Sequence, residues 1–176
     1  MKFIETPIFG AFIIESSPFT DERGSFFRTF CQREFENHGL AKTFVQSSIS
    51  QNKFRGTLRG MHYQINPTSE CKLVRCIRGK AFDVIVDIRP ESPSFLQNFT
   101  IKLDEKNPVA LFIPPGIAHG FLTLVDNTEI LYQMSSYYEP SKAHGYRWDD
   151  PAFNIMWPKK PTIISVTDEN WSNFII

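Results

Sequence analysis

Residues Gly56–Arg78, GTLRGMHYQINPTSECKLVRCIR, contain two strand-like segments joined by a turn-forming stretch. Side chains of a strand alternate between its two faces. In the first segment this alternation predicts Leu58, Gly60, His62 and Gln64 on one face and Arg59, Met61 and Tyr63 on the other. After the turn-prone residues 66–69, the second segment begins at Lys72. We therefore expect His62 and Lys72 to lie on neighbouring strands and to point into one cavity.

Strand-like segments also fill most of the remaining chain. They run over residues 44–50, 57–64, 72–79, 80–89, 99–103, 109–115, 120–126 and 128–138. Gly, Pro, Asn or Asp separates most of them at spacings of roughly 8–12 residues, which is typical of a β-sandwich or barrel. Residues 3–15 predict short strands near a sheet edge, and residues 25–30 predict one more strand. We expect a helix within residues 31–42 and a single helical turn after Ser165, in a C-terminal segment that wraps the body.

Length and composition narrow the class of protein. The chain has 176 residues, with 19 basic and 19 acidic side chains. Its length suits one domain over residues 1–176, and its zero net charge argues against nucleic acid or an anionic membrane as partner. No apolar run approaches the ~18 residues that a membrane-spanning helix needs. Cys31, Cys71 and Cys76 lack the spacing of a zinc site or a disulfide framework, so we expect reduced thiols in a cytoplasmic protein.

A second patch, IPPGIAHGF (113–121), contains the pattern Pro114-x-Gly116-x-x-His119. This pattern resembles the second motif of cupin jelly rolls, whose barrels hold small ligands. Metal-binding cupins also carry a first motif with H-x-H and a nearby Glu, whereas this chain has His62-Tyr63-Gln64 there. His38 and His144 lie in helix-like or loop-like sequence, away from the barrel pattern. We therefore expect no metal ion and no other cofactor, and a metal-dependent oxygenase stays as an alternative.

Ten segments, taken in chain order, resemble the dTDP-4-dehydrorhamnose 3,5-epimerase family of sugar-nucleotide epimerases. They are FTDERGSFF (19–27), TLRGMHYQ (57–64), KLVR (72–75), FDVIVDIR (82–89), SPSF (92–95), IPPGIAHGF (113–121), LY (131–132), YY (137–138), WDDP (148–151) and ISVTD (164–168). The resemblance extends over nearly the whole chain. It implies an all-β fold, a cupin-type jelly-roll sandwich or barrel with a few short helices.

The resemblance implies epimerisation at C3, at C5 or at both carbons of a nucleotide-diphosphate-linked 4-keto-6-deoxyhexose, with dTDP-4-dehydro-6-deoxyglucose as the expected substrate. These hydrogens are acidic because their removal gives an enolate on the C4 oxygen. The reaction needs a base on one face, an acid on the other and a positive group at that oxygen. By resemblance, His62 is the base and Asp168 orients it. Lys72 stabilises the enolate, and Tyr132 is the acid.

Other positions are implied to line the pocket or to bind the nucleotide. They are Arg23, Phe26, Arg28, Gln46, Ser48, Arg59, Asp83, His119 and Tyr138. Arg23 and Arg59 suit a diphosphate, because a guanidinium meets phosphate oxygens bidentately. The family often has Glu at position 28 and Asn at position 48, so Arg28 and Ser48 bear on the choice of base. The family's homodimer, in which an N-terminal segment pairs with the partner's sheet and contributes to its site, is implied as well.

Several of these residues also have an ordinary structural interpretation. Asp168 suits the first turn of a helix near Ser165, where a negative charge is favourable. Tyr132 shares a strand face with Ile130 and Met134, which predicts a core position. His119 could bond the Pro-Gly turn. Three classes of protein stay open: a cofactor-independent epimerase acting on one or both carbons, a metal-dependent cupin oxygenase, and a non-catalytic protein that binds sugar nucleotides.

Overall fold

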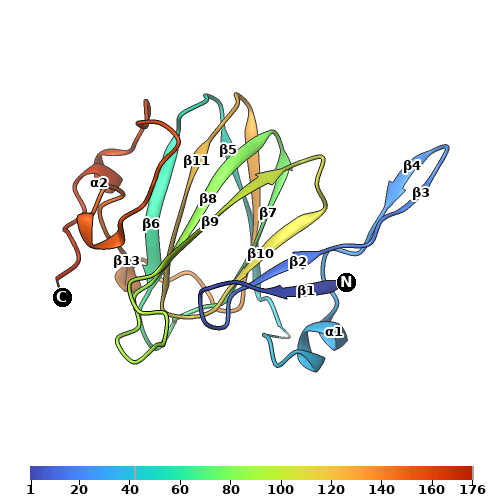
Figure 1. Cartoon of the computed structure of the whole chain (residues 1–176), viewed down its shortest axis with the longest axis horizontal. Coiled ribbons are helices and arrows are strands. Elements are labelled where there is room, and N and C mark those ends of the chain that lie inside the picture. Colours follow the sequence, from blue (N-terminus) through green and yellow to red (C-terminus); the bar gives the residue numbers. More distant parts are fainter. Residues whose placement is uncertain (42, 176) are drawn as a thin grey trace.

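The computed structural model describes residues 1–41 and 43–175, and its long strands form two antiparallel sheets that face each other (Figure 1). The six-stranded sheet has the order β1 (Lys2–Glu5), β2 (Phe12–Glu15), β10 (Val109–Ile113), β7 (Lys72–Arg78), β12 (Thr128–Met134) and β5 (Gln46–Asn52). The five-stranded sheet has the order β13 (Ala143–Gly145), β6 (Leu58–Gln64), β11 (Ile117–Thr123), β8 (Lys80–Asp87) and β9 (Asn98–Asp104). The all-β prediction is confirmed, and every strand predicted between residues 44 and 138 overlaps an observed one.

Apolar side chains from both sheets meet in the space between them. Val74 and Ile130 from the six-stranded sheet pack with Ile85 and Phe121 from the five-stranded sheet, and all four are almost fully buried. Burial of such a side chain contributes about 1.5–3 kcal/mol. This core holds the two sheets together, and inward-facing polar residues beside it line a cavity.

Helix α1 (Gln32–Asn37) covers part of the outer face of the six-stranded sheet. Its Phe35 is fully buried in a cluster with Ile14 and Phe112. The helix is shorter than the predicted span of 31–42, because the chain leaves the helical conformation at Gly39, where φ is +67°. Position 42 lies outside the described residues.

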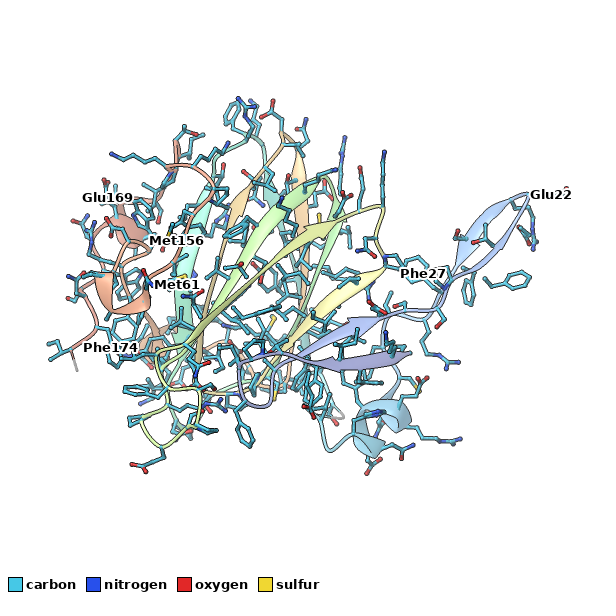
Figure 2. The ribbon with its side chains drawn as sticks, in the orientation of Figure 1. Glu22, Phe27, Met61, Met156, Glu169 and Phe174 are labelled. Carbon is cyan, nitrogen blue, oxygen red and sulfur yellow. The ribbon has the colours of Figure 1, made fainter. Side chains whose placement is uncertain are left out.

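A ribbon of two short strands, β3 (Phe19–Asp21) and β4 (Gly24–Phe26), projects from the body (Figure 1). Figure 2 shows Glu22 at the tip of this ribbon and Glu169 on the opposite side of the molecule. The strand predicted for residues 25–30 ends at Phe26, because the chain returns to the body at Phe27, whose ring lies 5.7 Å from the Arg75 guanidinium. The ribbon therefore has almost no contact with the rest of its own chain.

The C-terminal segment packs over the outer face of the five-stranded sheet, and the helical turn predicted after Ser165 is confirmed. It contains η1 (Pro140–Lys142), β13, η2 (Pro151–Phe153) and α2 (Val166–Glu169). Phe153 is fully buried against Met61 of β6. Ser165 caps α2, because its side chain accepts a hydrogen bond from the backbone N–H of Asp168. Among the described residues, no helix is both long and apolar enough to cross a membrane.

Candidate active site

Polar side chains from both sheets line a cavity of about 680 Å³ between them. The lining includes Gln46, Ser48, Ser50, Arg59, His62, Gln64, Glu70, Lys72, His119, Tyr132, Tyr138 and His144. His62 and Lys72 therefore share one cavity, as predicted, although their strands belong to different sheets. The volume suits a ligand of the size of a nucleotide or a sugar nucleotide.

A bulge in β6 sets the direction of the side chains on that strand. His62 pairs with His119 and Arg59 pairs with Phe121, so two residues of β6 stand opposite Gly120 alone. Arg59 and His62 consequently both face the cavity, and the prediction that they lie on opposite faces was wrong. Gly60 has φ +146°, and a Cβ atom there would lie 2.5 Å from the Cα of Gly120. The bulge therefore requires glycine at position 60.

The imidazole of His62 is held by a carboxylate from the C-terminal segment. His62 Nε2 lies 2.6 Å from Asp168 Oδ1, and the other ring nitrogen has no partner among the described residues. Burial alone would raise the pKa of Asp168, but the hydrogen bond and charge of His62, together with the Gly60 and Ser165 contacts, hold this pKa below its ordinary value. The His62 side chain is 43% exposed, and that of Asp168 is 8% exposed. His62 can therefore accept a proton from a ligand while Asp168 stabilises its charged form.

Lys72 brings an ammonium group to the same cavity from the start of β7. Its Nζ donates to the backbone carbonyl of His62 over 3.3 Å and lies 3.4 Å from Glu70 Oε1. Burial lowers the pKa of Lys72, while the charges of Glu70 and Asp83 act in the opposite direction. Lys72 is thus a basic group in surroundings of low dielectric constant, where its ammonium form acts strongly on a developing negative charge.

His119 and Tyr132 form the opposite part of the lining. His119 Nε2 lies 3.0 Å from both carboxylate oxygens of Asp83, which is itself fully buried. The ring of Tyr132 packs edge-on against His119, with ring centroids 5.9 Å apart. Burial, reinforced by the charge of Asp83, raises the pKa of Tyr132 well above its ordinary value. Its hydroxyl is therefore protonated throughout the neutral range and can donate a proton.

One wall of the cavity comes from β5 and from the segment after β12. Gln46 and Ser48 lie on β5, and the Gln46 side chain accepts a hydrogen bond from the backbone N–H of Tyr138. Arg59 Nε donates to Asn52 Oδ1 over 2.8 Å. Gln46, Ser48, Arg59 and Tyr138 are thus brought together with His62, Lys72, His119 and Tyr132.

Asp83, predicted to line the pocket, is instead fully buried and bonded to His119. Three other residues predicted for the site lie away from this cavity. Arg23 forms an ion pair with Asp21 on the ribbon, and Phe26 is 81% exposed there. Arg28 Nη1 lies 3.0 Å from Glu34 Oε1 on α1. Figure 1 shows the ribbon on the opposite side of the molecule from α2, which carries Asp168. Within one chain, these three side chains do not join the predicted site.

Comparison with known proteins gives the family. The model of the dTDP-4-dehydrorhamnose 3,5-epimerase family matches residues 5–175. The dTDP-4-dehydrorhamnose 3,5-epimerase of Shigella flexneri is 40% identical over 99% of this chain and 97% of its own. The chain belongs to this family.

Two solved structures share the fold of this epimerase-family chain. The Bacillus anthracis dTDP-4-dehydrorhamnose 3,5-epimerase, solved with TDP and PPi bound, superposes with a TM-score of 0.94 at 37% identity, over 98% of this chain and 99% of its own. The Legionella pneumophila dTDP-6-deoxy-D-glucose-3,5-epimerase, solved with dTDP-4-keto-L-rhamnose, gives a TM-score of 0.92 at 35% identity, over 98% and 92%. The protein is an isomerase with the cupin-type fold that the sequence predicted.

Several polar residues that line the epimerase cavity were not among the predicted site residues, and Gln64, Glu70 and His144 are three of them. Gln64 follows His62 by two positions on β6, and Glu70 precedes Lys72 by two positions, so their spacing was a usable signal. His144 lies on β13, which pairs with β6, and the interpretation of its position as away from the barrel was wrong. No local pattern marks this three-residue strand. Within the described part of the chain, no three His, Cys, Asp or Glu residues are grouped to hold a metal ion.

Proposed function

We propose that this enzyme inverts C3 and C5 of dTDP-4-dehydro-6-deoxyglucose to give dTDP-4-dehydrorhamnose. The observation that carries the proposal is that a histidine and a protonated tyrosine enter one cavity from facing sheets, with a lysine ammonium in the same cavity. Inversion at carbon needs proton removal on one face and proton return on the other. The activities in the names of the related enzymes support the same substrate.

In this mechanism His62 removes the proton next to the C4 ketone. Negative charge then develops on the C4 oxygen, where the Lys72 ammonium stabilises the enolate more than the neutral ketone. Tyr132 returns a proton from the opposite face. His62 then releases its proton to solvent and Tyr132 takes one up, and the cycle repeats at the second carbon. Proton transfer by a positioned side chain contributes typically about 10²–10⁴-fold to the rate.

Two carboxylates support these groups. Asp168 holds the ring of His62 and stabilises its imidazolium form, since it lies 2.6 Å away and stays ionised. Asp83 holds the ring of His119 beside Tyr132, with 3.0 Å between Asp83 Oδ1 and His119 Nε2. We assign both carboxylates to orientation and charge balance.

The nucleotide part of the substrate lies, in this proposal, along β5. Gln46, Ser48 and Tyr138 face that part of the cavity. Arg59 lines the cavity and suits the diphosphate. Its Nε donates to Asn52, and its two Nη atoms have no hydrogen-bond partner among the described residues, so they can bind phosphate oxygens.

The proposal includes a homodimer in which the ribbon enters the partner's cavity. Phe19 and Phe26 are 68% and 81% exposed on the ribbon, and Ile49 is 54% exposed on the outer face of β5. Arg75 is buried on the same outer face, yet its Nη1 has no hydrogen-bond partner among the described residues. An apolar edge and a buried guanidinium nitrogen without a hydrogen-bond partner both favour cover by a second copy. Arg23, Phe26 and Arg28 would then serve the partner's site.

A cytoplasmic location belongs to the same proposal. All three cysteines are free thiols, and Cys76 is buried. Reduced thiols suit a compartment that keeps cysteines from forming disulfides.

Proton NMR in deuterium oxide with dTDP-4-dehydro-6-deoxyglucose tests the function. We expect the C3 and C5 proton signals to disappear, with or without a chelator. Loss of only one signal would show that the enzyme acts on one carbon only. Loss of exchange when a chelator is added would favour a metal-dependent enzyme. No loss with any 4-keto sugar nucleotide would make the protein a binding protein.

The variant His62→Ala separates catalysis from binding. We expect this variant to abolish hydrogen exchange while its affinity for dTDP stays within about threefold of wild type. The substitution removes the imidazole beside the sugar and leaves the side chains that bind the nucleotide unchanged. His38→Ala serves as the matched control, since His38 lies at the end of α1 outside the cavity. Exchange that persists in His62→Ala would overturn the assignment of the base.

A further inference from the structure

Glu70 is a buried carboxylate that faces the reacting groups. It belongs to the loop between β6 and β7 and lines the cavity, and its side chain is only 7% exposed. Removing a carboxylate from water is costly unless a charge partner and hydrogen bonds compensate. Burial of the Glu70 carboxylate is therefore unfavourable by itself, which indicates that this side chain has a specific role in the cavity.

The contacts of Glu70 connect it to Lys72 on one side and to Gln64 on the other. Glu70 Oε1 lies 3.4 Å from Lys72 Nζ, and Glu70 Oε2 accepts a hydrogen bond from Gln64 Nε2 over 3.1 Å. Gln64 is itself fixed, because its Oε1 accepts from the backbone N–H of Glu139 and its Nε2 also donates to the carbonyl of Thr68. The orientation of the carboxylate is thus determined by three separate segments of chain.

We propose that Glu70 is a positioning residue for the reaction, which holds the Lys72 ammonium at the cavity wall and keeps it positively charged. The inference rests on the proposed function, because it assigns Lys72 to the enolate oxygen. Lys72 has a second anchor in the His62 carbonyl, 3.3 Å from Nζ, so the two contacts fix its nitrogen beside the base. A carbonyl orients the ammonium but supplies no full charge, whereas Glu70 does both.

The charges around Lys72 make this role necessary. Burial lowers the pKa of Lys72, and Glu70 is the main group that opposes this effect, with Asp83 of β8 second. Burial also raises the pKa of Glu70, against the pull of Lys72 and Gln64. The other titratable or charged side chains that line the cavity are Arg59, His62 and Tyr63 of β6, His119 of β11, Tyr132 of β12, Tyr138 after β12 and His144 of β13. Neutralising Glu70 would leave Asp83, of the carboxylates in the described part of the chain, to raise the pKa of Lys72.

The first test is the pH dependence of kcat in Glu70→Gln. This variant keeps the shape and the hydrogen bond to Gln64 but removes the charge. Because the ammonium form of Lys72 is the active one, kcat falls as the pH rises through the pKa of Lys72. In the variant this pKa should be lower, so its kcat should fall at lower pH than that of wild type. An opposite charge at this range moves a pKa by roughly 1–3, so we expect the ratio of kcat at pH 6.5 to kcat at pH 9 to rise about tenfold or more, with KM nearly unchanged.

Two further variants distinguish positioning from a merely structural role. Glu70→Asp keeps the charge and should restore much of the activity at pH 9. Glu91→Gln makes the same chemical change at an exposed position and should behave as wild type. Equal loss of kcat at every pH in Glu70→Gln, with no recovery in Glu70→Asp, would overturn the proposal.

The second test does not depend on the substrate. In protein carrying ¹³C-labelled lysine, the Lys72 signal is identified by its absence in Lys72→Met, and its titration is followed in wild type and in Glu70→Gln. We expect its midpoint at lower pH in the variant, and identical midpoints would overturn the pairing. If wild type shows no exchange of sugar hydrogens, the proposed function fails, and this titration still decides whether Glu70 controls Lys72.

Discussion

At the residue scale, the cavity gives different proton affinities to groups that lie close together. Tyr132 is kept protonated by burial and by the charge of Asp83, whereas Asp168 is kept ionised by its contacts with His62 and Gly60. These surroundings keep a proton on the acid Tyr132 and a negative charge beside the base His62. They thereby support the division of roles between the two side chains.

Removal of the tyrosine hydroxyl should separate proton removal from inversion. In Tyr132→Phe, His62 and Lys72 are intact, so the enolate still forms and a proton still returns on the His62 face. We expect hydrogen exchange at C3 or C5 to continue, while net epimerisation falls about 10²–10³-fold. Exchange by NMR and product by chromatography measure the two rates, and equal loss of both would contradict the role of Tyr132 as the second proton carrier.

At the element scale, the bulge of β6 decides which side chains reach the cavity. It brings Arg59 and His62 to the same face and directs Met61 into the outer cluster with Phe153. The bulge depends on close contact between Gly60 and Gly120. A second element, the loop after β8, depends in a similar way on one buried carboxylate, Asp87.

Gly60→Ala should damage both stability and activity. Its Cβ would overlap the Gly120 backbone at a φ of +146°, and we expect a loss of about 2–4 kcal/mol in the free energy of unfolding. Gly39→Ala is the matched control, because Gly39 also has a positive φ, +67°, but nothing within 4 Å of the added atom. It should cost about 1 kcal/mol. Urea unfolding measures both, and equal costs would contradict the steric argument.

Asp87→Asn should destabilise the protein by about 2–4 kcal/mol at neutral pH. Asp87 is fully buried and accepts hydrogen bonds from Arg89, Ser92 and Ser94. Burial raises its pKa, but these bonds outweigh burial and hold the pKa below its ordinary value.

The sign of the pH effect follows from this lowered pKa. The contribution of Asp87 is fully present above the unfolded-state pKa of about 4. It is lost as the pH falls from there through the lower pKa of the folded state. Urea midpoints of wild type and Asp87→Asn should therefore converge below about pH 4, and a constant difference would contradict the assignment.

At the scale of the whole molecule, one chain lacks part of the predicted site. The cavity holds His62, Lys72 and Tyr132, but the ribbon that carries Arg23 and Phe26 projects away from it (Figure 1). A symmetric dimer repeats each contact twice, so two exchanged ribbons would complete two cavities.

Mixed dimers test this arrangement. His62→Ala and Arg23→Ala should each have little activity, but a co-expressed mixture contains dimers in which a normal cavity receives a normal ribbon. Random pairing gives half mixed dimers with one complete site of two, so we expect about a quarter of wild-type activity. His62→Ala mixed with Tyr132→Phe is the control, since both changes lie in the cavity and no complete site can form. Recovery in neither mixture would contradict ribbon exchange.

The sequence by itself determined the fold class and most of the cavity. Alternation over residues 57–64 and 72–79 predicted the two strands that carry His62 and Lys72, and both strands were confirmed. The predicted strand face of Tyr132, shared with Ile130 and Met134, also agrees with the structure, in which all three face the interior. These features depend on strand periodicity, which is a local property of the chain.

Tertiary structure alone decided the remaining features. The bulge at Gly60 arises from pairing with Gly120, sixty positions along the chain, and it reversed the expected face of Arg59. His144 reaches the cavity because β13 pairs with β6. The spacing of Glu70 before Lys72 places the two residues close together, but the hydrogen bond from Gln64 to Glu70 depends on tertiary structure. Register, burial and charge pairing are interactions between distant segments, so no local pattern of residues can specify them.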